Sequence, residues 1–85
     1  MKSFTYVVKD ELGIHARPAG LIVNEAKKYA STITIECEGK KAVATKLMAL
    51  MAMAVKTGQT ICVTVEGDDE VVACESFEKF IQTTL

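Results

Sequence analysis

The sequence predicts an α+β domain with four strands and three helices in the order βαββαβα. Short runs rich in β-branched and aromatic residues predict strands, and apolar residues spaced three and four positions apart predict helices. These segments follow one another along 85 residues without a repeat, a low-complexity tract or a Pro/Ser/Gly-rich linker. We therefore expect residues 1–85 to form a single domain around one small core.

Three strands are predicted over residues 4–8, 32–37 and 60–65. The last of these alternates strictly between polar and apolar side chains, apart from Cys62. A fourth, weaker strand is expected over residues 40–44, after a turn at Glu38-Gly39-Lys40 in which Gly39 supplies a positive φ. The segments 32–37 and 40–44 would then form a β-hairpin.

The first helix is predicted to begin just after His15. Pro18 suits its first turn, because the φ of proline is already helical and its missing N–H would have no partner there. One face of this helix is apolar and the other carries charged and polar groups. The apolar positions are Ala19, Ile22, Val23, Ala26 and Ala30.

The middle helix differs because it is apolar on every side between Leu47 and Val55. Thr45 is the predicted N-cap and Gly58 the predicted stop, which gives about three turns. A core of this size cannot easily enclose every face, so we expect an exposed apolar patch, although burial as ordinary core packing is the alternative.

The last helix is predicted from Asp68 and Asp69 onward. Both carboxylates suit a helix N-terminus, where they can cap free N–H groups. Apolar residues then recur at helical spacing at Ala73, Phe77, Phe80 and Ile81. This helix closes the predicted fold.

Composition excludes several classes of function. Ten basic against eleven acidic residues give a net charge of −1, which argues against a nucleic-acid binder or a polybasic membrane anchor. The longest apolar run is about half the ~18 residues that a membrane span needs, and no signal peptide is recognised, so a cytoplasmic protein is expected. Three distant cysteines, at positions 37, 62 and 74, indicate neither a disulfide framework nor a zinc site.

His15 is the only histidine and the main candidate for chemistry. It lies at the start of the first helix, where free N–H groups and the positive end of the helix dipole favour an anion such as phosphate. Arg17 can add a guanidinium donor, and a neutral imidazole has one nitrogen free to act as a nucleophile. The alternative is a histidine that only caps the helix or hydrogen-bonds in the loop. Metal, hydrolase-triad and nucleotide-binding motifs are absent.

The segment Gly13-Ile14-His15-Ala16-Arg17-Pro18-Ala19 resembles, without a gap, the active-site signature of the HPr family. These are the histidine-containing phosphocarrier proteins of the bacterial phosphoenolpyruvate:sugar phosphotransferase system. The stretch Leu47-Met48-Ala49-Leu50-Met51, followed by Gly58, is similar to the second helix of that family. The resemblance covers essentially the whole chain and implies an open-faced sandwich, with a four-stranded antiparallel sheet and three helices on one face.

The resemblance also implies a role for each site residue. His15 would accept phosphate on Nδ1 from phosphorylated enzyme I and pass it to EIIA components of sugar permeases, with Arg17 stabilising the phosphoryl group. Leu47, Met48 and Met51, which we call the apolar patch, would dock both partners together with Gly20. Lys27 and Lys46 would surround the patch with positive charge, or serve only as solvated surface groups.

The expected protein is a monomeric carrier that is a substrate of enzymes and needs no cofactor or metal. Lys46 stands where many members of the family carry a serine that a regulatory kinase phosphorylates, so we expect such a kinase to leave this chain unmodified. Thr45 is adjacent, but its expected role is the helix cap. The alternative function is an HPr-like regulatory or non-sugar pathway module without the serine site.

Overall fold

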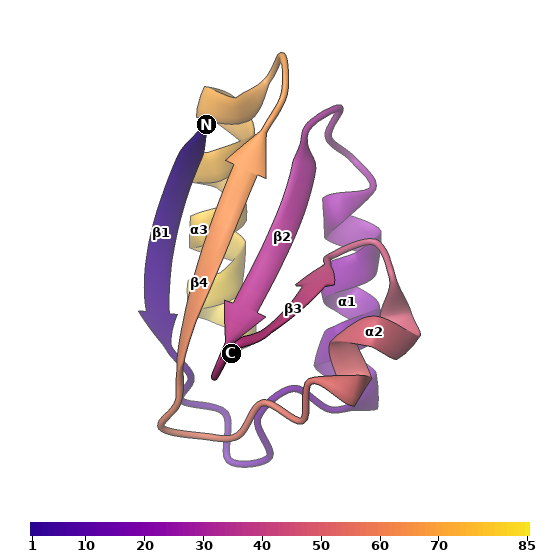
Figure 1. Ribbon diagram of the computed structural model, residues 1–85, viewed down its shortest axis with the longest axis vertical. Helices are drawn as coiled ribbons and strands as arrows, with labels where there is room; N and C mark the ends of the chain where they lie inside the picture. Colours follow the sequence, from indigo (N-terminus) through magenta and orange to yellow (C-terminus); the bar gives the residue numbers. More distant parts are fainter.

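The computed structural model describes all 85 residues and confirms the predicted order of elements. The strands are β1 (Lys2–Val7), β2 (Thr32–Cys37), β3 (Lys40–Val43) and β4 (Thr60–Glu66), and the helices are α1 (Ala16–Ala26), α2 (Leu47–Ala52) and α3 (Glu70–Thr84). The strands form one antiparallel sheet in the order β1-β4-β2-β3, so β1 and β3 are its edges. Figure 1 views the sheet from its open side.

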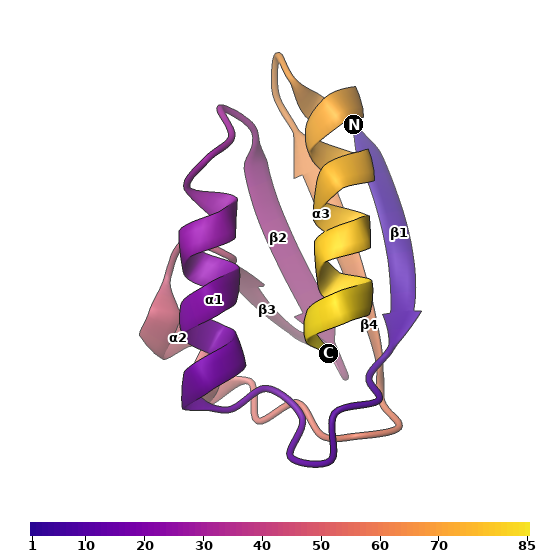
Figure 2. The same cartoon turned by 180° about the vertical axis from the view of Figure 1, so that it is seen from behind.

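The three helices lie on one face of the sheet, as the resemblance implies. Helices α1 and α3 run antiparallel across that face, and α2 packs beside α1 next to β3 (Figure 2). The other face carries no covering layer (Figure 1). None of the helices is long and apolar enough to cross a bilayer.

Alternate residues of the strands face the helices and form the core. One row across the sheet consists of Phe4, Val63, Ile35 and Ala42, which pair in register and are all buried. The helices close the core with Ala19, Ile22, Val23 and Ala26 from α1 and Ala73, Cys74, Phe77 and Ile81 from α3. Full burial of one large apolar side chain contributes about 1.5–3 kcal/mol, so this core fixes both helices on the sheet.

The structure corrects the predicted helix caps. Lys46, and not Thr45, occupies the N-cap position of α2. Asp69 does occupy the N-cap position of α3, but its carboxylate makes no capping hydrogen bond. It accepts hydrogen bonds from the backbone N–H groups of Ala30 and Ser31 and from the Ser31 hydroxyl. Asp69 therefore ties the start of α3 to the segment before β2, an interaction between residues 38 positions apart.

Helix α2 is also shorter than the predicted three turns. It contains six residues, and Ala54 then adopts a left-handed conformation with φ of 51°. The side chains of Met53 and Val55 are both buried, so the chain must leave the helix to bring them into the core. Helix α1 likewise ends at Ala26, four residues before the last predicted apolar position.

Candidate functional site

The loop between β1 and α1 delivers His15 to one end of the sheet. Gly13 in this loop has φ of 69°, and a Cβ there would lie 2.1 Å from the carbonyl oxygen of Val55. The same oxygen accepts the N–H of Ile14 over 3.0 Å, and the Ile14 side chain is buried. The glycine thus lets the loop lie directly against the segment after α2. The next residue, Ile14, anchors the loop there through its hydrogen bond to Val55 and its buried side chain.

The end of α3 holds the other side of this loop. The backbone oxygen of Leu85 accepts the N–H groups of Lys9 and Asp10 over 2.8 and 2.6 Å. The Asp10 carbonyl then accepts the N–H of Gly13 over 3.0 Å, and its carboxylate oxygen Oδ1 accepts the N–H of Leu12 over 2.9 Å. These bonds fix both the backbone and the side chain of Asp10.

His15 is the N-cap residue of α1. Its backbone is extended, its carbonyl accepts the N–H of Ala19 over 2.9 Å, and its side chain makes no capping hydrogen bond. The side chain is 36% exposed, and Nε2 lies 3.6 Å from Oδ1 of Asp10. That contact is longer than a hydrogen bond. The imidazole is therefore accessible to a reactant and lies beside a carboxylate.

The first turn of α1 offers an anion site beside this imidazole. The N–H groups of Ala16 and Arg17 have no partner inside the helix, no side chain caps them, and Pro18 has no N–H. The positive end of the helix dipole also lies at this N-terminus of α1. An oxyanion placed next to His15 would thus meet two free backbone donors.

Arg17 lies on the same turn, with an exposed side chain that forms no ion pair within the chain. It borders a hollow of about 560 Å³ together with His15. The hollow is lined by Asp10, Glu11, Leu12, His15, Arg17, Pro18, Leu21, Thr83 and Thr84. The structure therefore brings the two predicted chemical residues, His15 and Arg17, to one open hollow.

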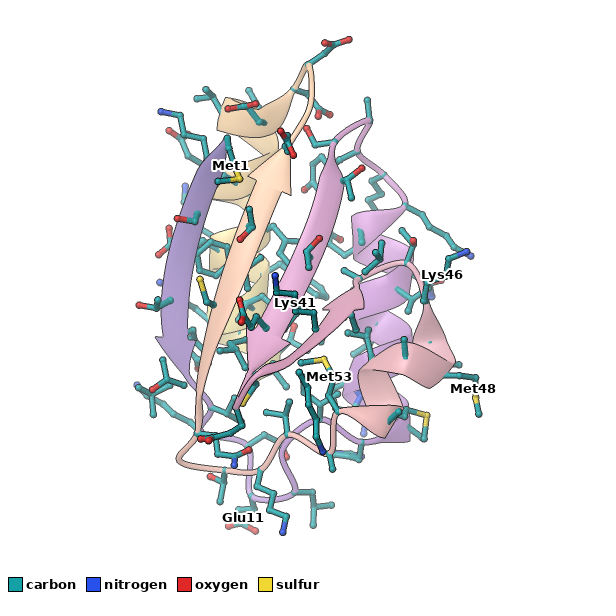
Figure 3. All side chains as sticks on the ribbon, viewed as in Figure 1. Met1, Glu11, Lys41, Lys46, Met48 and Met53 are labelled. Atoms are coloured by element: carbon teal, nitrogen blue, oxygen red, sulfur yellow. The ribbon has the colours of Figure 1, made fainter.

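The apolar patch on α2 is exposed, as expected. Leu47, Met48 and Met51 are 40%, 76% and 39% exposed, whereas Leu50 is completely buried. Figure 3 shows Met48 projecting away from the ribbon and Met53 lying toward the sheet. Only one side of α2 is thus used by the core.

The other predicted interface residues are distributed over α1 and the start of α2. Gly20 lies within α1, which contacts α2, and a Cβ at this position would meet no atom within 4 Å. Lys46 precedes Leu47 and is exposed. Lys27 is the exposed C-cap of α1, at the opposite end of that helix from His15. The structure does not bring Lys27 to the hollow.

Several residues of the hollow did not stand out in the sequence. Asp10 carried one usable signal, since it lies five positions before the only histidine and in the same loop. Thr83 and Thr84 carried none, because only the packing of α3 brings them to the N-terminus of α1.

The chain is similar in sequence and in fold to one family of known proteins. Residues 2–83 match the family model described as PTS HPr component phosphorylation site. The chain is 45% identical over 75 residues to the HPr-like protein Crh of Halalkalibacterium halodurans, covering 88% of this chain and 89% of the relative. The solved structure of a Mycoplasma histidine-containing phosphocarrier protein is 36% identical, with a TM-score of 0.92 over 99% of this chain and 97% of that chain.

A second solved structure comes from a related Bacillus protein. Crh of Bacillus subtilis is 37% identical, with a TM-score of 0.77 over 92% of this chain and 90% of that chain, and it is described as a swapped, intertwined dimer. The family match spans almost the whole sequence, and the solved structures share both its fold and more than a third of its residues. The chain therefore belongs to the HPr family of the phosphotransferase system.

Proposed function

We propose that this protein is a phosphoryl carrier, which accepts a phosphoryl group on His15 from phosphorylated enzyme I and donates it to EIIA components of sugar permeases. It works stoichiometrically, as a substrate of the enzymes before and after it. The observation that carries the proposal is the exposed imidazole of His15 beside two unpaired backbone N–H groups and a free guanidinium. The chain's membership of the HPr family supports the same reading.

The residues of the hollow have distinct parts in this carrier. Nδ1 of His15 is the nucleophile, because Nε2 faces Asp10. The N–H groups of Ala16 and Arg17 bind oxygens of the transferred group, and the Arg17 guanidinium adds charge-assisted hydrogen bonds. The site is open, so a partner must cover it to exclude water during transfer.

The proposed docking surface is the apolar patch together with Gly20, Lys27 and Lys46. Three apolar side chains exposed on one short helix are well suited to burial by a partner. The absence of a side chain at Gly20 leaves open space beside α1 that a partner can approach. The two lysines would steer acidic surfaces toward the patch.

Phosphorylation in vitro tests the carrier chemistry. The protein is incubated with phosphoenolpyruvate, magnesium and a bacterial enzyme I, and its intact mass is measured before and after mild acid. We expect one acid-labile phosphate on the wild type and none on His15→Ala. The variant should keep its circular dichroism spectrum, because the imidazole is not part of the core. Phosphate retained by His15→Ala would refute the assignment.

A regulatory module is the second candidate function. Two observations favour it: the 45% identity to the HPr-like protein Crh, and Lys46 in place of the regulatory serine expected from the resemblance. A module that only binds has no need of a nucleophile, so His15 and Arg17 favour the carrier. If several active enzyme I preparations leave the wild type unphosphorylated, the regulatory module becomes the preferred function.

We also propose that the monomer is the acting species. All six residues of β1 pair with β4 of the same chain, which completes the sheet without a second copy. The swapped dimer described for Crh makes this worth testing directly. Light scattering during gel filtration should give about 9 kDa, and a mass near twice that value would show a dimer instead.

A further inference from the structure

Asp10 is the only carboxylate within ion-pair distance of His15. Its Oδ1 lies 3.6 Å from Nε2, and the two side chains are 30% and 36% exposed. An ionised carboxylate can only accept protons in hydrogen bonds, so it favours an N–H on the ring nitrogen that faces it. In a neutral imidazole, the other nitrogen then carries the free lone pair.

The carboxylate is held in place independently of His15. The backbone N–H of Asp10 donates to Leu85, its carbonyl accepts from Gly13, and Oδ1 accepts from the N–H of Leu12. A group fixed in this way loses little conformational entropy when it pairs with the imidazole. The fold therefore supplies a preorganised negative charge on one specific side of the ring.

We propose that Asp10 is a positioning residue that keeps His15 in its Nε2–H tautomer and so presents the Nδ1 lone pair to the phosphoryl group. The consequence for transfer rests on the proposed carrier function. The tautomer itself is a property of the free protein and is measurable without any partner.

The same carboxylate also balances charge during transfer. The Nδ1 lone pair forms the new bond to phosphorus while the bond from phosphorus to the donor atom breaks, and that bond's electron pair stays on the donor. The proton remains on Nε2, so the ring gains positive charge, which the carboxylate of Asp10 offsets. On transfer to the acceptor the pair returns to Nδ1 and the ring is neutral again.

The first test is nitrogen-15 NMR of the free protein labelled at histidine, which reports the tautomer directly. Asp10→Ala should lower the ratio of Nε2–H to Nδ1–H tautomer by about two- to fivefold, the range of a partly exposed ion pair. Asp10→Asn keeps an oxygen for the N–H of Leu12 but removes the charge, so it should give a smaller shift in the same direction.

Glu11→Gln is the matched control. It removes the same charge from the lining of the same hollow, but Glu11 makes no ion pair with His15. We expect its tautomer ratio to equal that of the wild type. An unchanged ratio in both Asp10 variants, or an equal shift in Glu11→Gln, would overturn the proposal.

The second test is the rate of phosphoryl acceptance from phosphorylated enzyme I. Asp10→Ala should lower kcat by a similar two- to fivefold and leave KM for the carrier unchanged, because Asp10 acts on the nucleophile and not on docking. A change in KM alone would assign Asp10 to docking and contradict the proposal. If even the wild type accepts no phosphate, the carrier function fails, while the tautomer measurement still decides the role of Asp10.

Discussion

At the residue scale, Gly13 meets two separate requirements. Its φ of 69° favours glycine, and a Cβ would clash with the backbone of Val55 and Lys56. Gly13→Ala should therefore lower the free energy of unfolding by about 3 kcal/mol, from left-handed strain and loss of the Ile14 hydrogen bond. Urea denaturation monitored by circular dichroism measures this change.

Gly58→Ala separates the effect of a left-handed φ from the effect of a steric clash. Gly58 has φ of 86°, but a Cβ there meets no atom within 4 Å. Only the conformational strain remains, so we expect a loss of about 1 kcal/mol. Equal losses at Gly13 and Gly58 would show that the close approach to Val55 is unimportant.

Asp69 links two loops through its charge. Hydrogen bonds from the Ser31 side chain and from the backbone of Ala30 hold the pKa of its carboxyl below the usual value. A lowered pKa stabilises the folded state at pH values above the unfolded-state pKa, and this contribution disappears as the pH falls through the folded-state pKa. Asp69→Asn should therefore lower Tm at pH 7, and the difference from the wild type should shrink toward pH 3.

Thermal unfolding at a series of pH values checks this prediction. The amide of the variant cannot accept every one of the three hydrogen bonds, because its nitrogen is a donor. Asp68→Asn is the control, since Asp68 is exposed and makes none of these bonds. A Tm difference for Asp69→Asn that is the same at pH 3 and pH 7 would exclude the charge as its cause.

At the scale of single elements, the end of α2 is strained. Ala54 is exposed and has φ of 51°, a conformation that glycine adopts more readily than alanine. Ala54→Gly should raise the free energy of unfolding by about 0.5–1 kcal/mol. Ala52→Gly, at the last residue of the same helix and also exposed, should lower it, by about 0.5 kcal/mol. Changes of the same sign at both positions would contradict a strained left-handed conformation at Ala54 after the end of α2.

The exposed side of α2 permits a second prediction, about docking. Met48 is 76% exposed and contributes nothing to the core, so Met48→Glu should leave Tm within a degree or two. If the apolar patch binds enzyme I, the added charge should raise KM for phosphoryl transfer by about tenfold. Val72→Glu on α3, where the side chain is 64% exposed, is the matched control and should leave KM unchanged. A normal KM for Met48→Glu would remove Met48 from the docking surface.

At the scale of the whole molecule, local chemistry determined most of what the sequence could predict. The start of α1 followed from Pro18, and the β2–β3 hairpin followed from Gly39, whose φ is 79°. Both features depend on residues a few positions apart. The same hairpin also holds Glu38 at φ of 52°, which nothing in its residue type indicates. Here the register of the two strands imposes the conformation.

The features that escaped prediction depend on contacts between distant segments. Helix α2 ends early because Val55 must pack into the core and hydrogen-bond to the loop before His15, some forty residues away in the chain. Asp69 likewise makes its hydrogen bonds to a distant segment, the one before β2, instead of capping its own helix. In the site, His15 and Arg17 were predictable from a contiguous motif, whereas the presence of Thr83 and Thr84 in the lining of the hollow required the packed position of α3.

Because the sheet and the helices share a single core, we expect residues 1–85 to unfold as one cooperative unit. The buried row from Phe4 to Ala42 crosses all four strands, and both long helices pack on it. Calorimetry should give equal calorimetric and van't Hoff enthalpies of about 60 kcal/mol for 85 residues. The chain has no tryptophan and two tyrosines, so each tyrosine can be observed alone. The Tyr29→Phe variant keeps only Tyr6, a probe on β1, and the Tyr6→Phe variant keeps only Tyr29, a probe just after α1. Coincident midpoints for both probes would support one domain, whereas an earlier transition at Tyr6 would show that β1 detaches while the rest stays folded.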